Sequence, residues 1–263
     1  MTEFQQPVLK SGFFRESMVV FNRQLRMNLR NPAWVVIGLT QPILYLLLFG
    51  PLLKPLVAQF PGGADNAYTF LVPGLLVQLG LFGAFFAGFS LIGEWREGVI
   101  EAERVTPASR GALLFGRLYR DLLQILVQAI ILVLLGLVMG MDFKPVGIIV
   151  GIAITVLIGG AGAAASNAFA LLVKSEDVMA PVTNMLLMPI LLLSGIFLPM
   201  SFGAQWLETL ADVIPTKHIV DAVRASFFGD LGMADIGWGV GWTVVLFALA
   251  VWWGISTFRK ENA

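Results

Sequence analysis

Long apolar runs separated by short polar breaks dominate the pattern of this chain. Six of these runs each contain about the 20 residues that a tilted helix needs to cross a hydrocarbon layer about 30 Å thick. The runs cover residues 33–53, 69–92, 122–141, 146–173, 179–200 and 237–258. Inside a bilayer the backbone polar groups must be satisfied within the protein, and runs of this length satisfy them as helices. The pattern therefore predicts an all-helical (all-α) membrane protein with six transmembrane helices.

Composition agrees with a chain that lies mostly within a membrane. Apolar residues make up 57% of the sequence and charged residues 13%, a balance far from that of soluble globular domains. The segments between the runs are each shorter than the roughly 50 residues that an independent domain usually needs. We therefore expect one membrane domain over residues 1–263, with a cytoplasmic interfacial helix in 1–31, six spans within 33–258 and a cytoplasmic tail at 259–263.

The placement of charge is more informative than its sum. The 17 Lys and Arg residues balance the 17 Asp and Glu residues, so no bulk attraction to nucleic acid is expected. Most of the Lys and Arg residues lie before the first run, between the second and third runs, or after the last. The positive-inside rule then predicts that both termini lie in the cytoplasm. We expect a multi-pass protein of a plasma membrane, namely the inner membrane of a bacterium. The chain has no cysteine, which excludes disulfides and thiolate metal sites.

The first thirty residues predict an amphipathic helix in the cytoplasmic headgroup layer, in contact with membrane lipids. One side of this helix is apolar and the other is rich in arginine. The apolar residues are Phe13, Phe14, Met18, Phe21, Leu25 and Leu29, and the arginines are Arg15, Arg23, Arg26 and Arg30. Two interpretations stay open: an anchor that only orients the first span, and an elbow that also contacts a cytoplasmic partner.

A charged segment at 94–107 separates the second run from the third. The spacing of Glu94, Glu97 and Glu101 places these carboxylates on one side of a short helix. We expect this helix to end at Thr106, because the residue before a proline avoids helical geometry, and Ser109 to cap the next helix. A merely solvated linker is the alternative.

Three stretches of the sequence resemble a known family. They are residues 68–78, residues 94–117, and residues 193–199 followed by 215–224. With the order of the six runs, they make the chain similar to permease subunits of ABC-2 type transporters, particularly the daunorubicin-resistance type of drug exporter. The resemblance implies a permease that moves a hydrophobic or amphiphilic compound, a drug or a lipid-like molecule, out of the cytoplasm or inner leaflet.

The resemblance also implies partners. A second permease chain, identical or related, would complete the path, and two copies of a P-loop ATPase subunit would bind ATP and Mg²⁺. This chain has no Gly-x-x-x-x-Gly-Lys-Ser/Thr motif, so we expect it to be no enzyme and to hold no cofactor or metal. A non-transporting six-span scaffold or assembly factor stays open as an alternative, as does a permease for a glycolipid or polysaccharide.

By the same resemblance, the 94–107 helix is a coupling helix that docks into a cleft of the ATPase. Glu97, Glu101 and Arg104 are the expected contacts, and Gly98 would allow close approach. The candidate residues are Glu94, Arg96, Glu97, Gly98, Glu101, Arg104 and Pro107.

A stripe of aromatic residues in the second run is the candidate substrate path. Four phenylalanines recur there at helical spacing, and amide side chains occur in the same run and in two others. The candidates are Gln78, Phe82, Phe85, Phe86, Phe89, Asn167 and Asn184. Alternatively, the phenylalanines face lipid or pack against neighbouring helices, and the asparagines form hydrogen bonds between helices.

The segment between the fifth and sixth runs mixes apolar and charged residues, which fits two short amphipathic helices broken at Pro215. The resemblance makes them partly re-entrant helices at the outer leaflet. The candidate residues of this region are Pro199, Trp206, Pro215, His218, Asp221 and Arg224. His218 is expected to cap or line the interface, and the aspartates to face water or to pair with Lys217 and Arg224.

Overall fold

A computed structural model describes residues 12–30, 33–55, 66–104, 106, 109–200, 203–230 and 232–261, apart from the side chains of Trp34, Arg104, Met233, Ala234, Asp235 and Glu261. All regular structure in these ranges is helical. The helices are α1 (Phe13–Arg30), α2 (Ala33–Leu53), α3 (Ala67–Arg96), α4 (Val99–Arg104), α5 (Arg110–Val138), α6 (Pro145–Val173), α7 (Glu176–Leu193), α8 (Gln205–Asp212), α9 (Pro215–Phe228) and α10 (Met233–Glu261). The all-helical fold class is confirmed.

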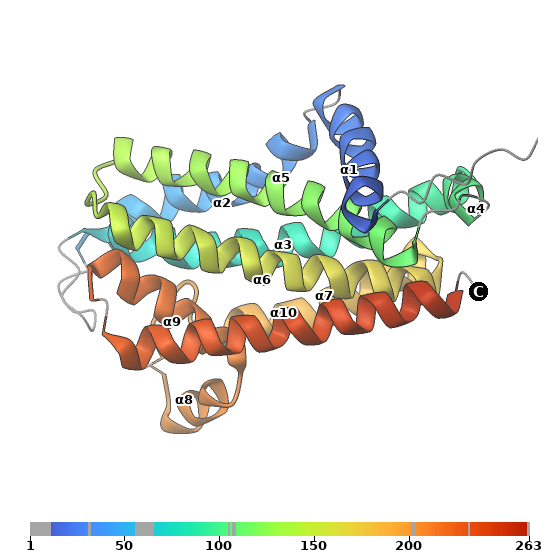
Figure 1. Cartoon of the computed structure of the whole chain (residues 1–263). Helices are drawn as coiled ribbons and strands as arrows, with labels where there is room; N and C mark the ends of the chain where they lie inside the picture. The colour runs from blue at the N-terminus through green and yellow to red at the C-terminus, as the bar shows by residue number, and fades with distance from the viewer. Residues whose placement is uncertain are drawn as a thin grey trace, which may run out of the picture.

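Within the described ranges, 6 helices are long and apolar enough to cross a membrane, namely α2, α3, α5, α6, α7 and α10. These long helices run along a common direction, and α1 lies across them near one end (Figure 1). That end also holds α4 and the C-terminus, and we call it the α1–α4 end. The short helices α8 and α9 lie toward the opposite end, which we call the α8–α9 end.

The core is built around α3, whose sequence is apolar on all sides. A helix of this kind is stable only when neighbours cover its whole circumference. Val72, Leu76 and Val77 accordingly have no exposed surface. Asn66 begins the helix by accepting a hydrogen bond from the backbone N–H of Tyr68 at 3.0 Å.

Small residues let α3 and α6 approach each other at backbone distance. A Cβ atom at Gly80 would lie 2.9 Å from the carbonyl oxygen of Thr155, and one at Gly88 would lie 2.6 Å from that of Ser166. The hydroxyl of Ser166 also donates to the carbonyl of Phe85 at 2.8 Å. Close approach through small residues is the usual way in which membrane helices associate, so α3 and α6 form one tightly packed pair.

The fifth span is shorter than the sequence predicted. The apolar run 179–200 predicted a helix to Met200, but α7 ends at Leu193. The chain turns at Gly195, whose φ of 72° suits glycine far better than other residues. Arg224 of α9 stabilises this turn by donating to the carbonyl oxygen of Gly195 at 3.0 Å. The apolar residues after Leu193 therefore belong to a turn rather than to the span.

Candidate functional site

The charged segment between α3 and α5 contains a break that the sequence did not predict. A single helix was expected from Glu94 to Pro107, and this was wrong at its beginning, because α3 continues to Arg96 and α4 begins only at Val99. Gly98 separates the two helices with a φ of 76°, a left-handed conformation that other residues adopt at a cost. Glu94 therefore belongs to α3. Pro107 and the side chain of Arg104 lie outside the described part of the chain.

Glu94 is held inside the protein by two other helices. Its Oε2 accepts hydrogen bonds from Nη2 and Nε of Arg117 in α5, at 2.7 and 3.2 Å. Its Oε1 accepts one from Nε2 of Gln24 in α1 at 2.6 Å. Because both oxygens are engaged and the residue is buried, the expectation that Glu94 lies on the face of a partner-binding helix is corrected.

Arg117 extends the same contacts to α4. Its side chain is 1% exposed, and its Nη2 also donates to Oε2 of Glu103 at 2.8 Å. The other oxygen of Glu103 accepts a hydrogen bond from Arg23 of α1 at 2.5 Å. One buried guanidinium thus binds carboxylates of α3 and α4, and Glu103 links α4 back to α1.

A second arginine in α5 extends the cluster. Nε and Nη2 of Arg120 both donate to Oδ1 of Asp121, at 2.9 and 2.6 Å. Nη1 of Arg120 donates to Oε1 of Gln24 at 3.1 Å and to the hydroxyl of Ser90 at 3.3 Å. Gln24 therefore connects the two arginines, because its amide also donates to Glu94.

We call this cluster the ion-pair network. It consists of Arg23, Gln24, Ser90, Glu94, Glu103, Arg117, Arg120 and Asp121. Three arginines face three carboxylates, so the formal charges cancel. Buried charges are tolerated when they are paired. Removing one partner strongly destabilises the fold, because the other charge then stays buried without compensation. The network therefore holds α1, α3, α4 and α5 in a fixed arrangement at the α1–α4 end.

Sequence reasoning missed the network because it began the third span at residue 122 and placed the charged residues before it in the segment between two spans. The signals that could have revealed it are the predicted N-cap at Ser109, which the structure confirms, and the charges that follow it. A helix beginning at Arg110 places Arg117, Arg120 and Asp121 inside the first half of a long apolar helix. Charges at such positions face a protein interior or a polar partner rather than lipid.

The interfacial helix α1 has three faces rather than the two that were expected. A narrow face with Ser17, Val20 and Gln24 is buried. Gly116 of α5 permits this contact, since a Cβ there would lie 2.8 Å from the carbonyl oxygen of Ser17. The arginines lie on a second face, and Phe14 occupies a third, where it is 66% exposed. The buried contact is therefore polar and small, whereas much of the apolar face remains uncovered.

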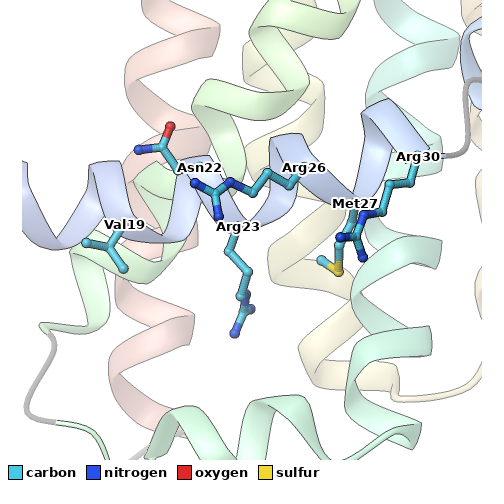
Figure 2. Close-up of a pocket in the computed structure, with 6 residues that line it drawn as sticks. All are labelled: Val19, Asn22, Arg23, Arg26, Met27 and Arg30. Carbon is cyan, nitrogen blue, oxygen red and sulfur yellow. The ribbon is translucent and has the colours of Figure 1, made fainter.

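The arginine face of α1 borders an open cavity of about 470 Å³. Figure 2 shows Arg23, Met27 and Arg30 directed to the same side of α1. The lining residues are Val19, Asn22, Arg23, Arg26, Met27 and Arg30. Because Arg23 reaches Glu103, the cavity lies on the side of α1 that faces α4. We call it the arginine cavity.

The other predicted coupling residues lie at the surface around α4. Glu97 and Glu101 are exposed. Arg96 is also exposed and pairs with Glu176 of α7 at 3.0 Å, which joins α3 to the beginning of α7. Ile100 is 3% exposed and anchors α4 in the apolar core. The short helix thus has a buried side and an accessible acidic side.

The predicted substrate-path residues do not gather at one site. Phe82 and Phe86 line a cavity of about 220 Å³ with residues of α2 and α5. Phe85 packs against the main apolar cluster, and Phe89 against a second one. The aromatic stripe therefore divides between one cavity and the packed interior.

The amide residues expected along this path are scattered as well. Gln78 and Asn167 are buried, and the polar atoms of their side chains have no hydrogen-bond partner among the described residues. Asn184 is exposed on α7 and donates to the carbonyl of Ala180 in its own helix at 3.0 Å. It thus forms that bond within α7 and not to a neighbouring helix.

The α8–α9 end contains the two short helices that were expected, separated just before Pro215, which begins α9. His218 caps α8, because its Nε2 lies 2.9 Å from the carbonyl oxygen of Asp212. Lys217 pairs with Asp212 at 2.5 Å and with Asp221 at 3.5 Å. The predicted local pairing of these aspartates is therefore confirmed. Trp206 is 69% exposed.

Arg224 is the central residue of this end. Its guanidinium lies over the ring of Phe70 in α3, 4.0 Å from the ring centroid, and 3.8 Å from Asp221. Burial lowers the pKa of Arg224 to about 10, although the charge of Asp221 opposes this shift, so the side chain stays protonated at neutral pH. A cavity of about 190 Å³ beside it also contains Pro199 in its wall.

Comparison with known proteins agrees with this architecture. Residues 15–228 match the model of the ABC-2 type transporter family. The chain is 29% identical over 237 residues to the daunorubicin resistance ABC transporter permease protein DrrB1 of Streptomyces coeruleorubidus, which covers 88% of this chain and 82% of that protein. It is 22% identical over 219 residues to the doxorubicin resistance ABC transporter permease protein DrrC of Mycobacterium tuberculosis. That alignment covers 82% of this chain and 78% of the relative. Because the family match spans most of the sequence, the chain belongs to the ABC-2 type transporters, as a transmembrane permease subunit of an ABC exporter.

Proposed function

We propose that this permease forms half of the path of an exporter driven by a separate ATPase subunit. A second permease chain, identical or related, completes the path, and two ATPase subunits serve the pair. ATP and Mg²⁺ bind to the ATPase subunits, and the permease has no ATPase site of its own. Both termini lie in the cytoplasm, and the protein resides in a plasma membrane, the inner membrane of a bacterium.

The observation that carries the proposal is the way in which α4 is held. Its buried side is anchored by Ile100, and Glu103 is bound by Arg23 and Arg117. Its other side exposes Glu101, next to Glu97 in the preceding turn. An element that passes on the movement of a partner needs a fixed base and an accessible surface, and α4 has both.

The ion-pair network would carry this movement into the membrane helices. Displacing α4 alone would separate Glu103 from Arg117, which is 1% exposed, and leave buried charges without partners. Because that separation is costly, a displacement of α4 is expected to move α3, α5 and α1 together. This supports a role of the α1–α4 end in coupling.

The faces of α1 support the proposed orientation. Arg23 points toward α4, since it binds Glu103. Phe21 lies two positions earlier, roughly 200° around the helix, so the apolar face points away from α4. With α4 in the cytoplasm, this geometry supports a position of the apolar face in the headgroup layer. The arginine cavity would then face the cytoplasm and accept an acidic surface of the ATPase.

The relatives support a hydrophobic or amphiphilic cargo. Two of them are named for resistance to daunorubicin or doxorubicin. We propose that this permease exports a drug or a lipid-like compound from the cytoplasm or the inner leaflet.

The experiment pairs affinity purification from detergent-solubilised membranes with an ATPase assay on the co-purified material. The test variant combines Glu97→Lys and Glu101→Lys, which reverse the exposed charges of the α4 region. The matched control is Glu208→Lys at the α8–α9 end. We expect the wild type and the control to recover an active P-loop ATPase subunit, and the test variant to recover much less of it at normal membrane levels. Recovery of the permease alone, in every variant, would contradict the proposal and favour a non-transporting scaffold.

A further inference from the structure

Two adjoining cavities form a groove between α1, α2, α3 and α5. The chamber nearer the ion-pair network has a volume of about 50 Å³, and the other has a volume of about 220 Å³. They share Gly83, Phe86 and Gln124 as walls. The groove therefore extends from the charged α1–α4 end into the apolar part of the helix bundle.

The walls of the two chambers differ in chemistry. The larger chamber is lined by Ile37, Leu79 and Phe82, with Gln41 and Gln128 among them. The smaller chamber is lined by polar side chains of three helices, and these are Asn28, Ser90, Arg120, Asp121 and Gln124. Such a division, polar at one end and mostly apolar at the other, matches the build of an amphiphile.

Asp121 gives the smaller chamber its specific chemistry. The residue is 6% exposed, and its Oδ1 accepts both hydrogen bonds from Arg120. Its Oδ2 is buried and has no hydrogen-bond partner among the described residues. A buried carboxylate oxygen without a donor is costly, and a bound ligand that supplies the donor would recover that cost.

The amide groups of the groove already have partners. Gln128 donates to the carbonyl of Val35 at 3.2 Å, and Gln41 donates to the hydroxyl of Tyr45 at 3.1 Å. Asn28 donates to Oε1 of Gln124, also at 3.2 Å. Among the described residues, Oδ2 of Asp121 is thus the buried side-chain atom of the groove walls that has no hydrogen-bond partner, and it favours a ligand with a hydrogen-bond donor.

We propose that this groove binds an amphiphilic amine, with its ammonium group at Asp121 and its apolar body in the larger chamber against Phe82 and Phe86. An ammonium is favoured over a neutral hydroxyl because both can donate a hydrogen bond to the carboxylate, but only the ammonium adds the Coulomb attraction of opposite charges, which is stronger in a buried site than in water. The inference rests on the proposed function and narrows the cargo class to compounds with a protonated N–H group. The site is built by one permease chain, since all of its walls come from α1, α2, α3 and α5.

Photo-crosslinking to the purified permease in lipid nanodiscs, without any ATPase, tests the site. The probe is a twelve-carbon primary amine that carries a diazirine on its chain, and labelled peptides are identified by mass spectrometry. We expect saturable labelling of the segments around Ile37 and Phe82. Dodecylamine should compete at least about tenfold better than dodecyltrimethylammonium, which has the charge but no N–H, and better than dodecanol or dodecyl sulfate.

Two variants distinguish the contribution of the Asp121 charge to binding from that of the groove volume. Asp121→Asn removes the charge at nearly constant shape and should lower specific labelling by about tenfold. Gly83→Leu should block the groove without touching a charge, because a Cβ at Gly83 would meet only the side chain of Ile125, at 3.4 Å. Asp212→Asn, at the far end, is the control and should leave labelling unchanged.

Labelling that is spread over lipid-facing helices, or that survives both variants, would overturn the proposal. Equal competition by dodecanol would overturn the preference for an ammonium group. Because this assay needs no ATPase, its result is independent of the co-purification experiment. Amine binding without any recovered ATPase would contradict the proposed function and leave the site standing, and the reverse result would contradict the site alone.

Discussion

Arg117 and Glu94 join α5 to α3 through two hydrogen bonds, of 2.7 and 3.2 Å, in the interior of the α1–α4 end. The same guanidinium binds Glu103, so that one side chain determines how three helices meet. This arrangement combines membrane helices and a surface helix in one electrostatic unit.

Replacing Arg117 by leucine should strongly destabilise the protein. The change leaves Glu94 and Glu103 buried without their main partner, which costs about 3 to 5 kcal/mol. Thermal unfolding in detergent measures the loss. Arg96→Ala is the control, because its pair with Glu176 is half exposed and contributes at most about 1 kcal/mol. Equal unfolding temperatures for the two variants would show that the network does not hold the helices together.

Replacing Arg23 by alanine should weaken coupling more than stability. The side chain is 43% exposed, so its pair with Glu103 contributes roughly 1 kcal/mol or less to folding. It is nevertheless a direct link from α1 to α4. We expect ATP-driven transport in reconstituted vesicles to fall several-fold while the ATPase subunit still co-purifies. Arg15→Ala, at an exposed position of the same helix, should transport normally.

Replacing Gly98 by alanine should strain the turn between α3 and α4. Its φ of 76° costs a non-glycine residue about 1 to 2 kcal/mol. We expect a lower unfolding temperature and weaker stimulation of the ATPase. Gly93→Ala is a matched control, since nothing lies within 4 Å of its Cβ position and it sits inside α3. If both variants behave alike, the left-handed turn has no special importance.

Replacing Arg224 by lysine should loosen the turn after α7. The planar guanidinium of arginine stacks on the Phe70 ring and donates to the carbonyl of Gly195 at the same time. The compact ammonium group of lysine cannot make both contacts in this way. We expect a loss of about 1 to 3 kcal/mol, measured by thermal unfolding, and faster protease cleavage at 194–200. Glu208→Gln changes the charge of another residue in the same cavity wall and serves as the control. An unchanged cleavage rate in the lysine variant would contradict this account.

Much of the fold follows from local patterns. The apolar runs predict the six long helices because apolar length is what a membrane requires, and Ser109 and Pro215 predict helix beginnings because their chemistry acts locally. The end of α7 was missed, since the sequence after Leu193 is still apolar. That turn depends on Arg224, which lies 29 residues away from Gly195.

The candidate site was less predictable than the fold, because it too depends on contacts between residues that are far apart in the sequence. Glu94 has the helical spacing of a surface carboxylate, and only contacts with α1 and α5 bury it. The break at Gly98 has a local signal that the prediction did not use, because a left-handed glycine commonly follows the C-cap of a helix. The return of the chain to the core at Ile100 depends on tertiary contacts. Asp121 lies just before the third apolar run and was not expected to line a site, although its place in α5 makes it a wall of the groove.

Helix α3 contacts the ion-pair network near one end and the turn after α7 near the other, and this has a mechanical consequence. At one end α3 contains Glu94 of the network, and near the other end Gly74 lies so close to the carbonyl of Ile196 that a Cβ would collide with it. The two positions are separated by about 30 Å of continuous helix. Such a helix behaves as a stiff rod that resists compression, so an axial push at α4 would arrive at the turn after α7 almost undiminished. Opening of the α8–α9 end would then need no signal other than the displacement of this rod.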